Sequence, residues 1–160
     1  MAAVKPSLFL DTSVLLAGIV ELHPPNPHAH AIMEAVAAGR LVRPATAFHC
    51  CLEFYAVATR LPVEYRVSAA DAGRLVQEEI LARFEVLDLP AGSRRALFAL
   101  AASDEVAGGR LYDLHIAEVA RAGGATIVLS ENRRHFASLL RFGMTVLTAA
   151  EFAPRLPRRR

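Results

Sequence analysis

Five short apolar runs, separated by longer stretches with a helical pattern, constrain the fold of this 160-residue chain most strongly. Each run is too short for a helix, is rich in Val, Leu and Ile, and is bounded by Gly, Pro or a polar residue. Such runs are typical of strands in a parallel sheet, which are buried on both faces and therefore lack polar alternation. The predicted strands are residues 7–11, 40–44, 84–89, 125–130 and 144–148.

The stretches between these runs have the features of helices. Gly39 and Gly123 each follow a helical stretch, and Pro90 stands at the first position of another. Thr148 and Glu151 have the spacing of a capping box at the start of a short last helix. The predicted helices are residues 27–38, 45–60, 68–81, 90–106, 110–122 and a short one from 148. Strands that alternate with helices predict an α/β fold, with helices on both faces of a mostly parallel sheet.

Length and composition indicate a single folded domain. The 160 residues fall within the usual size of one domain, and 54% of them are hydrophobic, which is enough to bury a sizeable core. We expect the domain to span residues 1–153 and a basic tail to follow over residues 154–160. Four arginines lie in residues 155–160, and the rest of the chain has two more acidic than basic residues. The tail is either a contact for RNA or a partner, or a solvated terminus.

The sequence also indicates where the protein acts. No apolar run approaches the length of about 18–20 residues that a membrane-spanning helix needs, and the first residues lack the pattern of a signal peptide. Cys50 and Cys51 are adjacent, so they form neither a CxxC metal motif nor a favourable disulfide pair. We therefore expect a protein of the reducing cytoplasm that has no membrane contact.

Two carboxylates lie where sites form in proteins of this class. Asp11 closes the first predicted strand, in FLDTSVLL, and ligands of parallel sheets bind beyond the carboxyl ends of the strands. The alternative role for Asp11 is the N-cap of a following helix. Asp113 lies in the first turn of the helix in GGRLYDLHIAEVA, where interaction with the helix dipole alone would explain it. His115 projects from nearly the opposite face, so we do not expect it in the same site.

Glu53 is the most informative single residue. It is the only carboxylate in ATAFHCCLEFYAVAT (45–59), a helix that is apolar almost all round and is expected to be well buried. A buried ionised carboxylate is costly unless it is paired or holds a metal. His49 is the structural alternative as its partner, since residues four apart share a helix face. A Glu53–His49 pair would not explain why an otherwise apolar helix carries these two residues. A functional role of Glu53 is therefore favoured.

The segment IVLSENRRHF (127–136) follows a predicted buried strand. Ser130, Glu131 and Asn132 therefore lie just past the carboxyl end of that strand, and a turn alone would explain Asn132. The Arg-Arg-His sequence at 133–135 is expected at the rim, either where it meets phosphates or in a solvated turn.

Carboxylates grouped at one edge of a sheet repel one another, and this repulsion favours protonation. A hard divalent cation, Mg²⁺ or Mn²⁺, relieves the repulsion and prefers oxygen ligands. A site of this kind suits metal-activated water that attacks a phosphodiester.

Four blocks of the sequence together resemble a known family. The blocks, in chain order, are FLDTSVLL (9–16), LEFYAVATR (52–60), GGRLYDLHIAEVA (108–120) and IVLSENRRHF (127–136). They resemble the signature blocks of PIN-domain ribonucleases and, more narrowly, of the VapC toxins of bacterial toxin–antitoxin pairs. The resemblance covers residues 8 to about 152. It implies a PIN-like three-layer sandwich with strand order 3-2-1-4-5 and a metal-dependent endoribonuclease activity that cuts RNA.

The same resemblance assigns roles to individual residues. Asp11, Glu53 and Asp113 correspond to the first three acidic positions of the family, which implies that they are catalytic and that they hold Mg²⁺ or Mn²⁺. Asn132 falls where the family often has a fourth acid and sometimes Asn, and it removes one negative charge, so one firmly bound metal is expected. Ser130 stands where the family often has a threonine that hydrogen-bonds near the site.

The resemblance also implies partners. The family forms homodimers, and a cognate antitoxin threads a helix and an extended tail into a groove of the toxin. No motif in this sequence marks either contact. The leading alternative function is a non-catalytic PIN-like module that binds RNA or a protein, which Asn132 favours and the intact acidic set opposes. An aspartyl-phosphate phosphatase would need a second Asp where Ser13 stands, and no Gly-rich phosphate loop is present.

Overall fold

The computed structural model describes residues 8–158, which form one parallel sheet surrounded by helices. The sheet has five strands in the order β3-β2-β1-β4-β5, and every neighbouring pair is parallel. The predicted fold class and strand order are therefore confirmed. The strands are β1 (Leu8–Leu10), β2 (Ala45–Ala47), β3 (Glu85–Leu87), β4 (Ile127–Leu129) and β5 (Thr145–Leu147).

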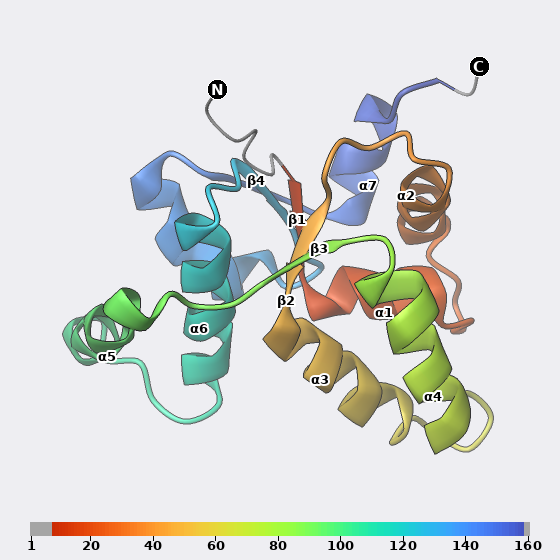
Figure 1. The fold of residues 1–160 in the computed structure, drawn as a ribbon, viewed down its shortest axis with the longest axis horizontal. Coiled ribbons are helices and arrows are strands. Elements are labelled where there is room, and N and C mark those ends of the chain that lie inside the picture. Colours follow the sequence, from red (N-terminus) through yellow and green to blue (C-terminus); the bar gives the residue numbers. More distant parts are fainter. Residues whose placement is uncertain (1–7, 159–160) are drawn as a thin grey trace.

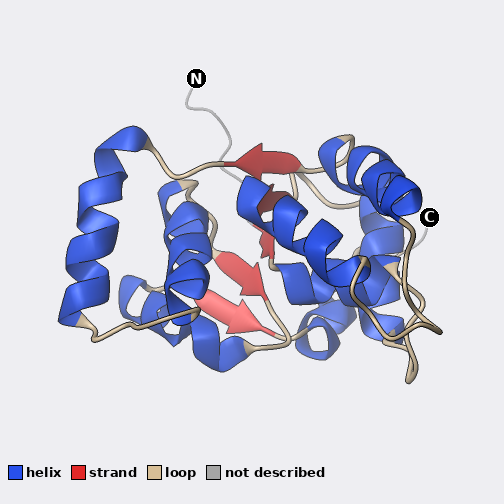
Figure 2. Cartoon of the chain, turned by 90° about the horizontal axis from the view of Figure 1, so that it is seen from below, coloured by secondary structure: helices blue, strands red, loops and turns tan. Residues whose placement is uncertain are grey.

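Helices cover both faces of this sheet. In Figure 1, α5 and α6 lie on one side of the strands, and α1, α2 and α7 lie on the other. Figure 2 shows from a second direction that helices enclose the strands. The α-helices are α1 (Thr12–Ile19), α2 (Pro27–Ala37), α3 (Phe48–Ala58), α4 (Ala69–Leu75), α5 (Arg94–Ser103), α6 (Arg110–Ala122) and α7 (Ala149–Phe152). A π-helix, η1 (Val76–Leu81), continues α4, and the 3₁₀ helices are η2 (Ala91–Ser93), η3 (Arg133–Phe142) and η4 (Ala153–Arg155).

The core lies between the central strands and the helices. Phe9 of β1, Phe54 of α3 and Phe136 of η3 are among its largest fully buried side chains. A close helix crossing adds to it, because a Cβ on Gly18 of α1 would stand 2.8 Å from the carbonyl oxygen of Ala29 in α2. A side chain at position 18 would therefore force the two helices apart. The packing holds β1 in the middle of the sheet, where the chain leaves for β2 on one side and returns at β4 on the other.

The second strand is not where the sequence predicts it. We expected residues 40–44, but β2 spans Ala45–Ala47, and the helix expected from residue 45 begins at Phe48. Arg43 has a φ of 45°, which no extended strand accommodates. Thr46 is fully buried and its Oγ donates to the Leu10 carbonyl at 2.8 Å. Pairing with both neighbouring strands thus overrides the helix preference of alanine.

The C-terminal residues follow α7 along the surface. Leu156 packs partly buried against the core, and Arg40 Nη1 donates to the Pro157 carbonyl at 2.8 Å. Arg159 and Arg160 of the predicted tail lie outside the described residues. No helix within residues 8–158 is long and apolar enough to cross a membrane.

Candidate active site

Asp11 lies at the carboxyl end of β1, at the point where the strand order switches direction. Its backbone N–H donates to the Leu129 carbonyl at 3.0 Å, which continues the ladder between β1 and β4. One carboxylate oxygen, Oδ2, accepts hydrogen bonds from Ser13 Oγ (2.8 Å) and Ser130 Oγ (2.9 Å). Asp11 is also the N-cap of α1, so the residue fills both of the roles that its position in the sequence suggests.

The Asp11 carboxylate is buried without a cation beside it. The residue is 6% exposed, and within residues 8–158 no Lys, Arg or His forms an ion pair with it. Burial raises the pKa of Asp11, the hydrogen bonds from Ser13 and Ser130 oppose that rise, and the charge of Glu53 adds to it. An ionised Asp11 is therefore unfavourable in this position until a positive charge is supplied.

Glu53 reaches the same site from α3. Its Oε2 accepts a hydrogen bond of 2.7 Å from Thr12 Oγ, and Thr12 directly follows Asp11. The alternative pairing of Glu53 with His49 does not occur. The His49 ring instead stacks on Tyr112, with centroids 5.4 Å apart and planes at 17°. Glu53 is thus fixed by the segment that carries Asp11 and not by its own helix.

The expectation that α3 is buried all round is wrong. Phe48, Leu52 and Tyr55 are exposed, while the opposite face, with Cys50 and Phe54, is buried. One apolar face packs on the molecule and the other faces outward. Glu53 lies at the boundary between them and is half-buried, so its burial is less severe than the apolar sequence of the helix predicts.

Asp113 completes the acidic group from the first turn of α6. Its Oδ2 lies 3.2 Å from His135 Nδ1, and the residue is half-buried. Burial raises the pKa of Asp113, the charge of His135 opposes this, and the charge of Glu53 again raises it. The charge of Glu53 therefore acts on both Asp11 and Asp113, and it links the three predicted carboxylates pairwise through Glu53.

Asn132 borders the site through its backbone. Its N–H donates to Ser130 Oγ at 3.0 Å, while its exposed side chain forms no hydrogen bond within the described chain. Glu131 does not replace the missing fourth acid, because its Oε1 accepts from the Ala149 N–H at 2.9 Å and caps α7. The fourth position of the site therefore has an amide near it and not a carboxylate.

The donor set suits a hard divalent cation, but the side chains do not form a finished cage. In the described residues, no group of three His, Cys, Asp or Glu side chains is placed to hold an ion. Mg²⁺ usually keeps several waters and takes only one or two carboxylates directly. A buried carboxylate without a counter-charge, on which the charge of Glu53 also acts, fits such an ion. Asp11 and Asp113 are the residues that would hold it.

The sequence-based prediction lacks two residues that act on Asp113: His135 by direct contact and Arg110 through its charge. His135 was expected at the rim, but it pairs with Asp113, which is 22 residues away in the chain and reachable only through the packing of η3 on α6. Arg110 lowers the pKa of Asp113 from three positions earlier on the same helix. The spacing of Arg110 and Asp113 is a signal that the sequence does contain, because residues three apart on a helix are neighbours.

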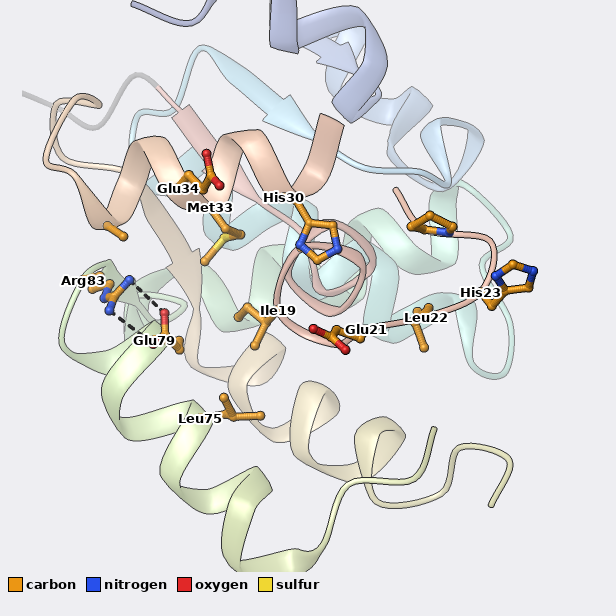
Figure 3. Close-up of a pocket in the computed structure, with 13 residues that line it drawn as sticks. Ile19, Glu21, Leu22, His23, His30, Met33, Glu34, Leu75, Glu79 and Arg83 are labelled. Atoms are coloured by element: carbon orange, nitrogen blue, oxygen red, sulfur yellow. Dashed lines mark hydrogen bonds and ion pairs between the residues drawn. The ribbon is translucent and has the colours of Figure 1, made fainter. Parts of the chain in front are cut away.

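A pocket away from the acidic group lies between α1, α2 and η1. It has a volume of about 690 Å³, and none of the four predicted site residues lines it. Figure 3 shows Ile19, Leu22, Met33 and Leu75 around it, together with Glu79, whose Oε2 pairs with Arg83 Nη1 at 2.8 Å. The pocket is apolar at its centre and charged at its rim, which suits an amphipathic segment of a protein better than a nucleotide.

Comparison with known proteins agrees with the fold and the order of the blocks. The sequence matches the PIN domain family over residues 8–139. Ribonuclease VapC27 of Mycobacterium tuberculosis (strain ATCC 25618 / H37Rv) is 34% identical over 129 residues, which cover 81% of this chain and 88% of that protein. Ribonuclease VapC40 of Mycobacterium tuberculosis (strain CDC 1551 / Oshkosh) is 30% identical over 123 residues, or 77% and 85% of the two chains.

A solved structure shows the same fold. VapBC2 from Rickettsia felis, bound to a DNA fragment from the promoter, superimposes with a TM-score of 0.60 at 16% identity, over 88% of this chain and 97% of that chain. The chain therefore belongs to the PIN-domain family, in the branch that contains the VapC ribonucleases.

Proposed function

We propose that this protein is a metal-dependent endoribonuclease and the toxin of a toxin–antitoxin pair. The observation that carries the proposal is the buried Asp11 carboxylate at the switch point of the sheet, without a counter-charge and in electrostatic contact with Glu53, which also acts on Asp113. The ribonucleases VapC27 and VapC40 are similar over most of their length, which supports RNA as the substrate.

Each residue of the site has a separate role in the proposed reaction. Asp11 and Asp113 hold the cation, and Ser13 and Ser130 fix the Asp11 carboxylate for this task through hydrogen bonds of 2.8 and 2.9 Å. Glu53, held by Thr12, accepts a hydrogen bond from the attacking water and orients it towards the phosphate. Bound Mg²⁺ or Mn²⁺ would neutralise charge on the scissile phosphate and acidify water. Asn132 leaves the site with one negative charge less than four acids would give, which favours a single metal.

Cleavage of a mixed RNA pool tests the proposal. Wild-type protein is expected to cut in Mg²⁺ or Mn²⁺ and not in EDTA, and Asp11→Asn is expected not to cut in either metal. Asp71→Asn is the matched control, because Asp71 is exposed on α4 and pairs with Arg74. Cutting by Asp11→Asn at the wild-type rate would contradict the assignment. Folded wild-type protein that binds the pool without cutting in any metal would favour the non-catalytic module.

The same proposal includes two protein partners. The solved neighbours VapBC2 from Rickettsia felis and FitAcB from Neisseria gonorrhoeae share the fold, and the family resemblance adds a cognate antitoxin as the partner of this chain. We assign the pocket between α1, α2 and η1 to this antitoxin as its binding groove (Figure 3).

The exposed face of α3, with Phe48, Leu52 and Tyr55, suits a second copy of the chain. Sedimentation is expected to give a dimer for wild type and a monomer for Leu52→Lys.

A further inference from the structure

A second, smaller pocket opens directly beside Asp113. It has a volume of about 210 Å³, lies between α6, η3 and the end of α5, and includes Asp113 in its lining. Besides Asp113, five further ionisable side chains line it, and three of these five are arginines. These side chains are Asp104, Arg110, Arg134, His135 and Arg141.

Some of these charges are already committed. Arg141 Nη2 lies 2.7 Å from Asp104 Oδ2, and His135 pairs with Asp113. The guanidinium groups of Arg110 and Arg134 are exposed and form no hydrogen bond or ion pair with any residue between 8 and 158. Two guanidinium groups without a hydrogen bond or ion pair in the described residues therefore share one pocket with Asp113, whose pKa the charge of Arg110 lowers.

Arg133 gives an internal contrast. It is adjacent to Arg134 in the chain and is also exposed, but its Nη1 lies 2.7 Å from Glu151 Oε1, and it does not line the pocket beside Asp113. The two neighbouring arginines therefore differ in their partners. Arg133 belongs to an ion pair on α7, whereas Arg134 remains available beside Asp113.

We propose that this pocket binds a backbone phosphate of the RNA substrate, next to the phosphate that is cut, through Arg110 and Arg134. The inference rests on the proposed ribonuclease function and names the residues that position its substrate. A polyanion that approaches three carboxylates is repelled by them, and two guanidinium groups on the approach offset this repulsion. The planar guanidinium also matches the oxygens of a phosphate with two parallel hydrogen bonds.

The first test measures binding without cleavage. A fluorescent RNA oligonucleotide is titrated in EDTA with wild type, Arg110→Ala, Arg134→Ala and the control Arg133→Ala. Each pocket variant is expected to weaken binding by about 5- to 10-fold and to lower the slope of log affinity against log salt by about 0.7, the value for one phosphate contact on a single strand. Arg133→Ala is expected to keep the wild-type slope. Equal behaviour of Arg134→Ala and Arg133→Ala would overturn the proposal.

The second test locates the phosphate. Each phosphate of the oligonucleotide is replaced in turn by an uncharged methylphosphonate at a 2′-O-methyl nucleotide. At one position the substitution is expected to weaken binding of wild type clearly more than binding of Arg134→Ala, which keeps only Arg110 for that phosphate, while both proteins respond equally at the other positions. Equal losses for wild type and Arg134→Ala at every position would contradict the pocket. If one position shows this difference but the protein cuts no RNA, the phosphate pocket is supported and the proposed ribonuclease function fails. If the protein cuts RNA but no position shows the difference, only the proposed phosphate pocket fails.

Discussion

Asp11 is held at the edge of the sheet by two serine hydroxyls, whereas Asp113, in the same acidic group, lies on a helix beside a histidine and an arginine. The Asp11 carboxylate is almost fully buried and forms no ion pair in the described residues; Asp113 is half-buried, and the charges of His135, Arg110 and His49 all lower its pKa. Both have a raised pKa, and in both burial is the main cause. On the proposed function, the Asp11 carboxylate at the sheet edge would bind the cation, while positive charge beside Asp113 on α6 would meet the substrate.

The largest expected effect follows from removing the buried charge. Asp11→Asn is expected to lower metal-dependent cleavage by more than about 10³-fold, because the cation contributes several kcal/mol to the transition state. Steady-state cleavage of a defined RNA measures this. Asp113→Asn is expected to lower cleavage less, since Asp113 is more exposed. A larger loss for Asp113→Asn than for Asp11→Asn would reverse the comparison.

Asp11→Asn is expected not to destabilise the fold. In the folded state the pKa of Asp11 lies above its ordinary value of 3.8, so ionised Asp11 opposes folding, and this cost grows as the pH rises through the raised pKa. Asn avoids the cost, accepts the same hydrogen bonds and caps a helix as well as Asp. Thermal unfolding in EDTA should give Asp11→Asn a melting temperature above that of wild type at pH 7, with the difference shrinking towards pH 4. A variant that melts well below wild type at pH 7 would contradict this.

An intermediate effect on cleavage is expected when a serine hydroxyl that donates to Asp11 is removed. Ser130→Ala removes a hydrogen bond that lowers the pKa of Asp11, so cleavage should fall by about 10- to 100-fold, the usual cost of a lost contact to a metal-binding side chain. The acid limb of the pH–rate profile should move to higher pH, since Asp11 then protonates more readily. Ser103→Ala, at the exposed end of α5, is the control. An unshifted profile would mean that Ser130 does not act through Asp11.

The smallest effect is expected on the helix side. His135→Gln removes the 3.2 Å contact with Asp113, but ion pairs that are this exposed contribute about 0.2–1 kcal/mol, so cleavage should fall by no more than about 5-fold. Single-turnover cleavage measures the difference. A loss of activity as large as that of Ser130→Ala would show that the His135–Asp113 contact matters as much for cleavage as the Ser130–Asp11 hydrogen bond.

Part of the arrangement around Asp11 was predictable from sequence because strand ends fix it, whereas Glu53 and Asp113 lie on helices. Asp11 and Ser130 follow strands that pair directly, so the topology alone brings their side chains together. The position of β2 was not predictable, because Ala-Thr-Ala has little strand preference of its own and pairs only through tertiary contacts. The contact of His135 with Asp113 depends on how η3 packs on α6, which no local pattern encodes.

Calorimetric titration of the protein with Mn²⁺ shows whether the buried Asp11 carboxylate binds a cation. Wild type is expected to bind one Mn²⁺ per chain, and Asp11→Asn is expected to bind it at least about 10-fold more weakly. The control Asp71→Asn should bind as wild type does. Equal affinity and stoichiometry for wild type and Asp11→Asn would contradict the account.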